Sequence, residues 1–367
     1  MSDERDRTSS GPDDHVASHA GAAVAAPFPS VPEILAAIRA GYGFDATALE
    51  EIDSGADAAA RAWRVAVADG PALFLKLRHG VRPAAILLPR HLTGLGMPEP
   101  VAALSTSSGA GWLDIGGWTA VVMPLIEGPS ALEAGLDLDG WRDLGRFAAR
   151  LHAARLPREL AAVLGVERFG PEATVAAHAV DALIDRLDPA VLDAHSLAVR
   201  DGWLAWRPEI RRLIALSEAL TASILARDAT DLPTRLVPCH ADLHAGNILL
   251  EAGRRIRIVD WDESVLAPPE RDLMFVRGSV VAGRVTDEQA DAFEAGYGRF
   301  AVDRELLAHY RVDWAVQDVT SFAWEVLVRP DRMPSTRPLA RRRFLGQFDP
   351  GGQVEAAFKI AGDLTLS

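Results

Sequence analysis

Three polar residues in the second half of the chain, Asp242, Asn247 and Asp260, are of types that handle metal ions and protons. Asn247 opens an apolar segment, residues 248–250, and a second one, residues 256–259, ends at Asp260. The residues between them can turn, so the pattern predicts a hairpin that brings Asn247 beside Asp260. An amide oxygen beside a carboxylate suits Mg²⁺. Asp242 lies on the loop leading to the same place, where a carboxylate can accept a hydroxyl proton.

The order of these residues is that of a kinase catalytic loop: His-x-Asp, then Asn, then a metal-binding Asp after a hairpin. The separations are 5 residues from Asp242 to Asn247 and 13 from Asn247 to Asp260. His-x-Asp alone occurs by chance, but the three elements in order between two short strands form a specific pattern. The alternative is an Asx-capped loop before an ordinary hairpin. Asp262 is a candidate for a further metal or loop contact.

Lys76 is unusual because only two of the 38 basic residues are lysines. It lies in the apolar segment 72–77, which is predicted to form a hairpin with residues 63–68. A lysine there can hold nucleotide phosphates as a point charge, or it can protect an edge strand against aggregation. The preceding turn, residues 53–57 with Gly55, would then cover the phosphates with backbone amides. The alternative is an ordinary surface turn.

The composition excludes several classes of protein. The net charge is −13, from 51 acidic and 38 basic residues, so nucleic acid is not expected as a partner, whereas a cationic small molecule is. The single cysteine, Cys239, rules out an internal disulfide and a cysteine-based zinc site. No apolar run reaches membrane-spanning length. The acidic start lacks the basic region of a signal peptide, so we expect a cytoplasmic protein.

The pattern along the chain predicts an α+β protein of two lobes. Residues 1–29 have few large apolar groups and are expected to be a disordered tail. A small mixed β lobe, residues 30–126, would open with a helix from Val31 and hold the hairpin, a helix over 83–95 and an apolar strand over 119–126. Because Pro124 lies inside that last strand, we expect an edge strand or a linker. A larger, mainly helical lobe, residues 127–367, would follow.

Several segments resemble the aminoglycoside phosphotransferase and choline kinase-like superfamily, and within it most closely the spectinomycin phosphotransferase branch. The sharpest are "LVPCHADLHAGNILL", "IRIVDWDE" and "APPERDLMFV", with weaker likeness in "LFLKLR", "VVMPLIEG" and "AHYRVDWAVQD". The resemblance covers roughly residues 31–360. It implies a two-lobed, protein-kinase-like fold and transfer of the γ-phosphoryl group of ATP or GTP, with Mg²⁺, to a hydroxyl group of a small molecule.

The resemblance also assigns residues. It makes Asp242 the catalytic base, Asn247 and Asp260 the Mg²⁺ ligands, and Lys76 the contact to the nucleotide phosphates. Asp272 would brace the catalytic loop from within the large lobe. The connector that contacts the adenine would include Met123, Leu125 and Ile126.

His240 and His244 are four residues apart, which in a helix would suggest a metal site. The following Gly246-Asn247 and strand indicate a loop instead, and the His-Glu-x-x-His pattern of zinc proteases is absent. We therefore expect His240 to brace the loop by hydrogen bonds. Cys239 is expected to be buried and inert.

One feature departs from the kinase pattern. Kinase-like folds pair the strand lysine with a glutamate of a helix. After Lys76 the next acid is Glu99, and Pro83 stands about where the glutamate is expected. Either another acid pairs with Lys76, or the site is assembled only when nucleotide binds.

The predicted helix over residues 304–328 is where we expect the acceptor to bind. Tyr310, Asp313, Trp314 and Asp318 recur at spacings of three and four, so they share one face. Aromatic and carboxylate groups together suit a polyhydroxylated cation; the alternative is a solvated face with one buried Trp. The preferred function is an antibiotic-modifying O-phosphotransferase. A metabolic kinase for choline, a sugar or an amino alcohol, and a nucleotide-binding regulator without turnover, are the alternatives.

Overall fold

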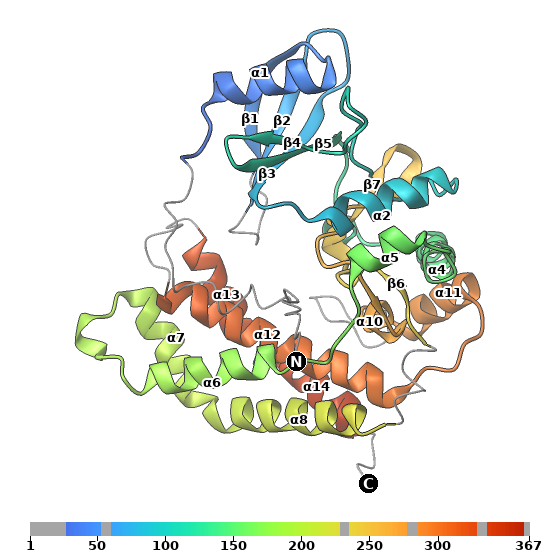
Figure 1. Cartoon of the computed structure of the whole chain (residues 1–367). Coiled ribbons are helices and arrows are strands. Elements are labelled where there is room, and N and C mark those ends of the chain that lie inside the picture. Colours follow the sequence, from blue (N-terminus) through green and yellow to red (C-terminus); the bar gives the residue numbers. More distant parts are fainter. Residues whose placement is uncertain (1–26, 53–59, 228–234, 277–284, 329–335, 363–367) are drawn as a thin grey trace, which may run out of the picture.

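The computed structural model describes residues 27–52, 60–227, 235–276, 285–328 and 336–362. A five-stranded sheet forms one end of the molecule and helices form the other (Figure 1). The predicted two-lobed α+β architecture is therefore confirmed. In the described part of the chain, no helix is long and apolar enough to cross a membrane.

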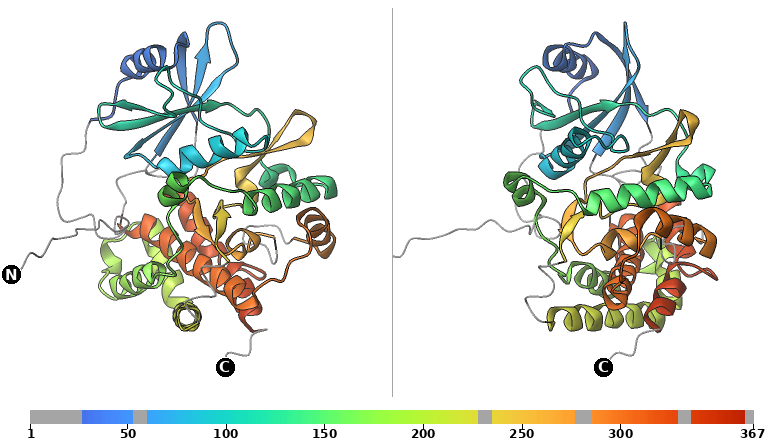
Figure 2. Two further views of the ribbon diagram at one scale, coloured as in Figure 1. Left: turned by 45° about the vertical axis from the view of Figure 1, so that its right-hand side comes forward. Right: turned by 90° about the vertical axis from the view of Figure 1, so that its right-hand side faces the viewer.

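The sheet is antiparallel with strand order β1-β2-β3-β5-β4. Helix α1 (Val31–Tyr42) packs on it through Ile34 and Ile38, which join a core that also contains Leu75 and Val122. Figure 2 shows α1 and the sheet in two further orientations. The strands are β1 (Ala46–Ile52), β2 (Ala60–Val67), β3 (Leu73–His79), β4 (Leu113–Ile115) and β5 (Trp118–Pro124).

The predicted hairpin is confirmed as β2 and β3, and the predicted helix as α2 (Pro83–Gly94). The sequence did not predict β1 or β4. The expectation of an edge or linker at 119–126 is wrong, because β5 lies between β3 and β4. Pro124 is tolerated there because it is the last residue of the strand, opposite Leu73.

The described chain includes the last residues of the expected tail. The Phe28 ring packs tilted against Trp63 and edge-to-face against Trp118, with ring centroids 5.6 and 5.0 Å apart. The Trp118 indole N–H donates to the carbonyl of Pro27 (3.2 Å). Residues 27–29 therefore pack on the sheet, while the rest of the expected tail lies outside the described residues.

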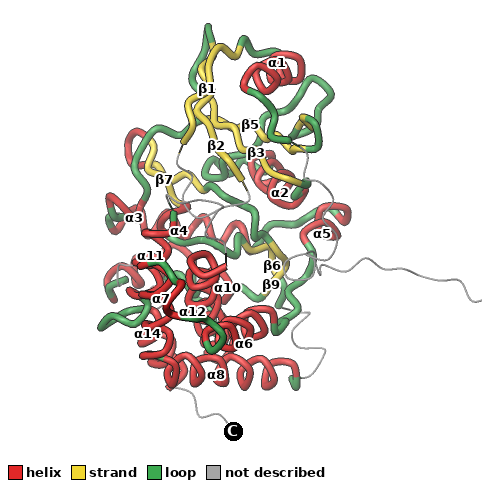
Figure 3. The backbone as a smooth tube through the Cα atoms, turned by 90° about the vertical axis from the view of Figure 1, so that its left-hand side faces the viewer, coloured by secondary structure: helices red, strands yellow, loops and turns green. Residues whose placement is uncertain are grey.

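The helical half is arranged around α12 (Arg304–Val328), which packs against α6, α8, α13 and α14. Figure 3 shows the five-stranded sheet with α1 and α2 at one end of the molecule, and most of the other helices, with β6 and β9 among them, at the other end. The remaining helices are α3 (Ala131–Ala134), α4 (Leu138–His152), α5 (Arg158–Leu164), α6 (Glu172–Ile184), α7 (Ala194–Ala205), α8 (Arg207–Leu225), α10 (Glu270–Leu273), α11 (Asp287–Tyr297), α13 (Arg337–Gly346) and α14 (Gln353–Gly362).

Two small sheets lie where the halves meet. Strand β6 (Val237–Cys239) pairs with β9 (Val265–Ala267), and β7 (Ile248–Glu251) pairs with β8 (Arg255–Ile258). The second pair is the hairpin predicted from the sequence. The segment after β5 crosses it closely: a Cβ on Gly128 would lie 2.0 Å from the carbonyl oxygen of Leu250. Only glycine permits this approach.

Candidate active site

A cavity of about 1400 Å³ lies between the sheet and the helical half. Strands β2, β3 and β5 supply one wall, the β7–β8 hairpin and the loop before it supply the inner end, and α12 with α13 supplies the remaining wall. The predicted site residues that line this cavity are Lys76, Met123, Leu125, Ile126, Asp242, Asn247, Asp260, Trp314 and Asp318.

The hairpin brings the three polar residues together as predicted. Asn247 is paired with Val259 at the open end of the hairpin, where the Val259 N–H donates to the Asn247 carbonyl (3.0 Å), so Asp260 follows directly. The Asn247 amide Nδ2 donates to the backbone carbonyl and to Oδ2 of Asp242, both at 2.8 Å. Asn247 therefore fixes the Asp242 side chain and leaves its own amide oxygen for another partner.

Asp272 holds the loop that carries Asp242. Its carboxylate accepts the backbone N–H groups of His240 (3.0 Å) and Ala241 (2.7 Å), and His152 Nε2 lies 3.0 Å from Oδ2. Burial opposes the charged form, but these hydrogen bonds outweigh it and lower the pKa of Asp272. His240 places its Nε2 3.0 Å from the Val259 carbonyl, which ties the loop to β8. These are the contacts expected of bracing residues.

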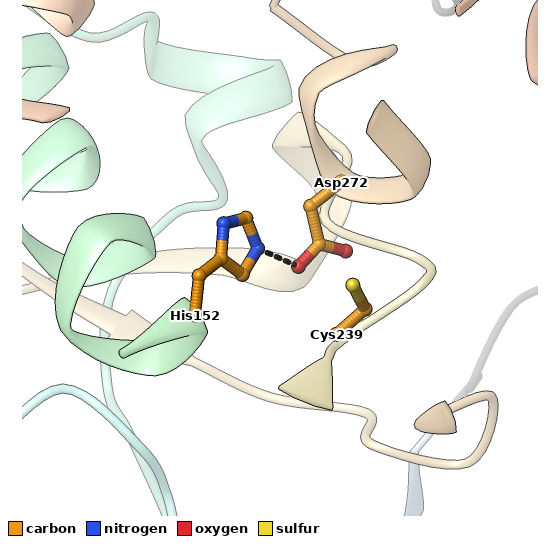
Figure 4. A group of neighbouring side chains, drawn as sticks. All are labelled: His152, Cys239 and Asp272. Atoms are coloured by element: carbon orange, nitrogen blue, oxygen red, sulfur yellow. Dashed lines mark hydrogen bonds and ion pairs between the residues drawn. The ribbon is translucent and has the colours of Figure 1, made fainter. Parts of the chain in front are cut away.

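His152, Cys239 and Asp272 form a buried cluster whose ligand atoms lie within 4.8 Å of one another (Figure 4). Both Asp272 oxygens already accept hydrogen bonds. The Cys239 thiol donates toward the carbonyls of Ala267 and Pro268, and burial raises its pKa well above the usual value. A protonated thiol is a poor metal ligand, so the cluster fits a packing role, and Cys239 is buried as expected.

Two of the four non-glycine residues that have positive φ angles in the described part of the chain lie at this site. Ala241 and Asp260 both have positive φ angles, 66° and 61°. This left-handed region is unfavourable for residues other than glycine and persists only where the surroundings fix it. The Asp272 hydrogen bond to the Ala241 N–H supplies such a constraint. The strained residues lie directly before Asp242 and at the end of the hairpin, so the strain sets the direction of both carboxylates.

Asp242 is in an environment that favours a proton. Burial, with a smaller contribution from the charge of Asp260, raises the pKa of Asp242 to about 7. Its Oδ1 atom is buried without a hydrogen-bond partner among the described residues. His244 Nε2 lies 3.6 Å from that atom, and burial lowers the pKa of His244 to about 4, so this imidazole is neutral near pH 7. Asp242 lines the cavity, and no hydrogen bond among the described residues offsets the burial of its Oδ1 atom.

Lys76 reaches the same place from the sheet. Its Nζ lies 3.0 Å from Asp260 Oδ1 and 3.0 Å from Asp262 Oδ2. Burial opposes the ammonium charge, but the two carboxylates outweigh it and raise the pKa of Lys76. Of the two explanations left open for the absent glutamate, the structure therefore supports the first: another acid pairs with Lys76. Gly55, expected to cover the phosphates, lies outside the described residues.

Two basic residues at this end of the cavity were not singled out from the sequence. Arg78 donates to Asp262, and Arg82 lies 3.0 Å from Glu263. Both line the cavity. The alternation of a strand could have identified Arg78, because residues i and i+2 point to the same face and Lys76 was already assigned. Arg82 follows the strand, where no periodicity applies.

The expected acceptor face of α12 is divided by the structure. Trp314 and Asp318 line the cavity, but Tyr310 and Asp313 do not. Tyr310 is buried in the core, 1% exposed, and Asp313 accepts a hydrogen bond from Ser217 of α8 (3.1 Å). The four residues do not share one face toward a ligand, because neighbouring helices cover α12 on several sides. The same wall is also lined by Ser321, Phe322, Glu325, Arg343, Gln347 and Gln353.

Asp318 keeps an unusual carboxyl group in this wall. Burial raises its pKa to about 6, although Gln353 Nε2 donates to its Oδ2 (2.9 Å). The Arg343 guanidinium also lines the cavity and lies over the Phe322 ring. This wall of the cavity thus offers carboxylates, aromatic surface and one arginine.

The sequence and the fold of this chain are similar to those of known proteins. The model of the phosphotransferase enzyme family matches residues 48–310. Two solved structures of a spectinomycin phosphotransferase are each 26% identical: a complex with ADP and spectinomycin (TM-score 0.81; 91% of this chain and 99% of that one) and an AMP complex (TM-score 0.77; 90% and 99%). An aminoglycoside phosphotransferase from Alicyclobacillus acidocaldarius, 17% identical, shares the fold (TM-score 0.53; 93% and 99%).

No curated protein sequence matches the chain. The family model nevertheless spans well over half of it, from β1 to α12, and includes every residue that carries the geometry of the inner end of the cavity. The resemblance seen in the sequence is therefore confirmed, and the chain belongs to the phosphotransferase enzyme family.

Proposed function

We propose that the protein transfers the γ-phosphoryl group of a Mg²⁺-bound nucleotide, ATP or GTP, to a hydroxyl group of a small cationic molecule, an aminocyclitol such as spectinomycin. The observation that carries the proposal is the meeting of Asp242, Asn247, Asp260 and Lys76 in one cavity whose opposite wall presents Trp314 and Asp318. Phosphoryl transfer needs the first group of residues. Recognition of the acceptor is left to the second.

Asp242 would act as the base. The acceptor hydroxyl oxygen attacks the γ-phosphorus, the bond from that phosphorus to the β,γ-bridging oxygen breaks, and the hydroxyl proton passes to Asp242. The hydrogen bonds from Asn247 Nδ2 (2.8 Å) hold one side of the carboxylate. Oδ1, buried and without a hydrogen-bond partner among the described residues, is the atom suited to receive the proton.

Asn247 and Asp260 would hold the magnesium ion. The fit is supported by the donor set, a neutral amide oxygen and a carboxylate at the end of one hairpin, which is typical of a hard cation. The ion would neutralise charge on the phosphates. Lys76 would hold the phosphates from the side of the sheet. Its ion pair with Asp260 keeps its ammonium group next to the residues that would hold the ion.

The nucleotide base would lie against the connector. Met123, Leu125 and Ile126 line the cavity beside Val101 and Ala103 of the small lobe. This apolar wall is the kind of surface that buries a flat heterocycle. Two solved neighbours are complexes with ADP and with AMP, which supports the binding of a nucleotide by this chain.

A cationic acceptor fits the opposite wall. Asp318 and Glu325 provide carboxylates and Trp314 an aromatic surface for an ammonium group. The neighbour that binds spectinomycin supports an aminocyclitol. Lys76 has acidic partners, which removes the reason for considering a regulator without turnover.

The test is nucleotide consumption by the purified protein, screened against aminocyclitols, aminoglycosides, choline and sugars, with Asp242→Asn as a matched control. We expect turnover with a cationic aminocyclitol and none in the control. Turnover with choline or a neutral sugar alone would replace the acceptor class while retaining the reaction. Turnover that persists in Asp242→Asn would contradict the proposed site.

A further inference from the structure

Within the part of the chain that the structure describes, the acids that pair with the sheet lysine Lys76 come from the other lobe and not from a helix beside the sheet. Kinase-like folds pair this lysine with a glutamate from a helix of the small lobe. Here α2 follows β3 and has the sequence PAAILLPRHLTG, without an acidic residue. Glu33 of α1 hydrogen-bonds to Ser30, and Glu99 pairs with Arg150 of α4. Glu33 and Glu99, the acids nearest the sheet on the described helix α1 and on the loop after α2, are therefore engaged elsewhere.

Asp262 takes that place from the other lobe. Its Oδ2 lies 3.0 Å from Lys76 Nζ and also accepts a hydrogen bond from Arg78. Lys76 and Arg78 are two residues apart on β3, so both side chains leave the same face of the sheet. The three side chains are 16%, 11% and 18% exposed for Lys76, Arg78 and Asp262. Because the three side chains are mostly buried, the attraction between them is screened only weakly.

We infer that Asp262 is a positioning residue that holds Lys76 and Arg78 toward the nucleotide phosphates, in the role of the absent helix glutamate. The inference rests on the proposed function. Lys76 Nζ is equally far, 3.0 Å, from Asp260 and Asp262. Without Asp262, only Asp260 of these two acids would remain beside Lys76. The ammonium would then compete directly with the magnesium ion for Asp260.

The surrounding contacts support a phosphate-binding end rather than a second metal ligand. Oδ2 of Asp262 is already shared by Lys76 and Arg78. Arg82 adds a third basic side chain, since it donates to the backbone carbonyl of Asp262 (3.1 Å) and lines the cavity. Three basic side chains at one end of a cavity suit a polyphosphate. One carboxylate among them fixes their directions.

The experiment measures binding of non-hydrolysable ATP and GTP analogues by calorimetry, without acceptor, with and without Mg²⁺. Asp262→Asn should weaken the preferred analogue roughly 10- to 100-fold, as loss of a group that orients a ligand-binding residue typically does, and it should do so in both conditions. The matched control is Glu263→Gln. Glu263 is the next acid and does not line the cavity, and its pair with Arg82 is 53% exposed on the Glu263 side, so affinity should fall much less than in Asp262→Asn.

A double-mutant cycle and a chemical label separate positioning from a general structural effect. Because Asp262 is inferred to act through both Lys76 and Arg78, Asp262→Asn should weaken binding less in the Lys76→Met background than in the wild-type protein, and an equal effect in both backgrounds would contradict the positioning of Lys76. Lys76 is one of only two lysines, so its acylation can be followed by mass spectrometry with Lys359 as reference. Loss of the Asp262 carboxylate should speed acylation of Lys76 relative to Lys359, because Lys76 Nζ then loses one of the two carboxylates that it contacts.

Each outcome has a distinct meaning. Wild-type affinity in Asp262→Asn overturns the inference, and weakening seen only with Mg²⁺ overturns it in favour of a metal ligand. If Asp262→Asn does not fold, Asp262→Glu serves, because its longer side chain should give intermediate affinity and wild-type affinity would contradict the inference. Absence of nucleotide binding by the wild-type protein would instead contradict the proposed function.

Discussion

The two ends of the cavity differ in how their residues are placed. At the phosphate end, Asp242, Asn247 and Asp260 lie on one loop and one hairpin, within a short stretch of chain. At the acceptor end, Trp314 and Asp318 come from α12, and Arg343 and Gln353 from α13 and α14. The first end is therefore organised by local structure and the second by the packing of helices. Under the proposed function, the hairpin would carry the chemistry and the packed helices would recognise the acceptor.

The largest expected effect breaks the phosphate end. Asp242→Ala should lower turnover by roughly 10²- to 10⁴-fold, because general-base catalysis is lost. Nucleotide affinity should change little, since the carboxylate faces the acceptor. Steady-state kinetics together with calorimetry measure the two effects. A fall in nucleotide affinity that matches the loss in turnover would mean that Asp242 belongs to nucleotide binding.

A second change at the same end concerns the metal. Asp260→Asn replaces an anionic ligand by a neutral one, so we expect loss of activity and weaker binding of the Mg²⁺-nucleotide. Calorimetry with and without Mg²⁺ tests this, because binding of metal-free nucleotide should suffer less. Equal weakening in both conditions would show that Asp260 acts through its ion pair with Lys76 instead.

The same division explains what the sequence could predict. The hairpin and its polar residues were correctly placed because a short turn between two apolar segments permits few registers. The acceptor-binding face of α12 was predicted incorrectly, because helical periodicity indicates which residues align but not how many neighbouring helices bury them. For that reason Tyr310 is buried in the core, and Asp313 accepts a hydrogen bond from Ser217 instead of facing the cavity. Asp262 was noticed but its partners on β3, far away in the chain, could not be inferred.

At the acceptor end, Asp318→Asn should raise the Michaelis constant of a cationic acceptor and leave that of the nucleotide nearly unchanged. Loss of the partner of a desolvated ammonium costs roughly 2–5 kcal/mol, which corresponds to about 30-fold or more. Asp313→Asn is the matched control: it lies on the same helix, has a similarly raised pKa, and does not line the cavity. Equal effects of the two substitutions would show that binding of the acceptor does not depend on the carboxylate in the cavity wall.

The carboxyl of Asp318 also makes acceptor binding depend on pH. Its pKa of about 6 means that the group is charged at pH 7.5 and becomes protonated as the pH falls through 6. The Michaelis constant of an acceptor that stays cationic should therefore rise as the pH is lowered from 7.5 to 5.5. Asp318→Asn should flatten this dependence. A profile unchanged by the substitution would assign the titration to another group.

The smallest expected effect concerns stability and uses Asp313, which the sequence placed in the acceptor site. Burial raises the pKa of Asp313 to about 6, whereas the value in the unfolded chain is near 3.8. The folded state then binds the proton more tightly, so stability is greatest at low pH and is lost as the pH rises from about 4 to 6.

At pH 8 the wild-type protein therefore carries a charge whose burial costs about 1–3 kcal/mol, a range that allows for partial exposure of the side chain. Asp313→Asn removes the charge and keeps an oxygen for the Ser217 hydroxyl, so it should raise the free energy of unfolding at pH 8. The gain should fall to about half at pH 5, where the wild-type carboxyl is mostly protonated when folded. Denaturant unfolding at both pH values, with kinetics on the same samples, provides the measurement. A variant that is more stable at pH 8 and binds acceptor normally would place Asp313 in the packing between α8 and α12; a loss of stability at both pH values would show instead that its charge is needed by a neighbour such as Arg271, whose attraction opposes the effect of burial.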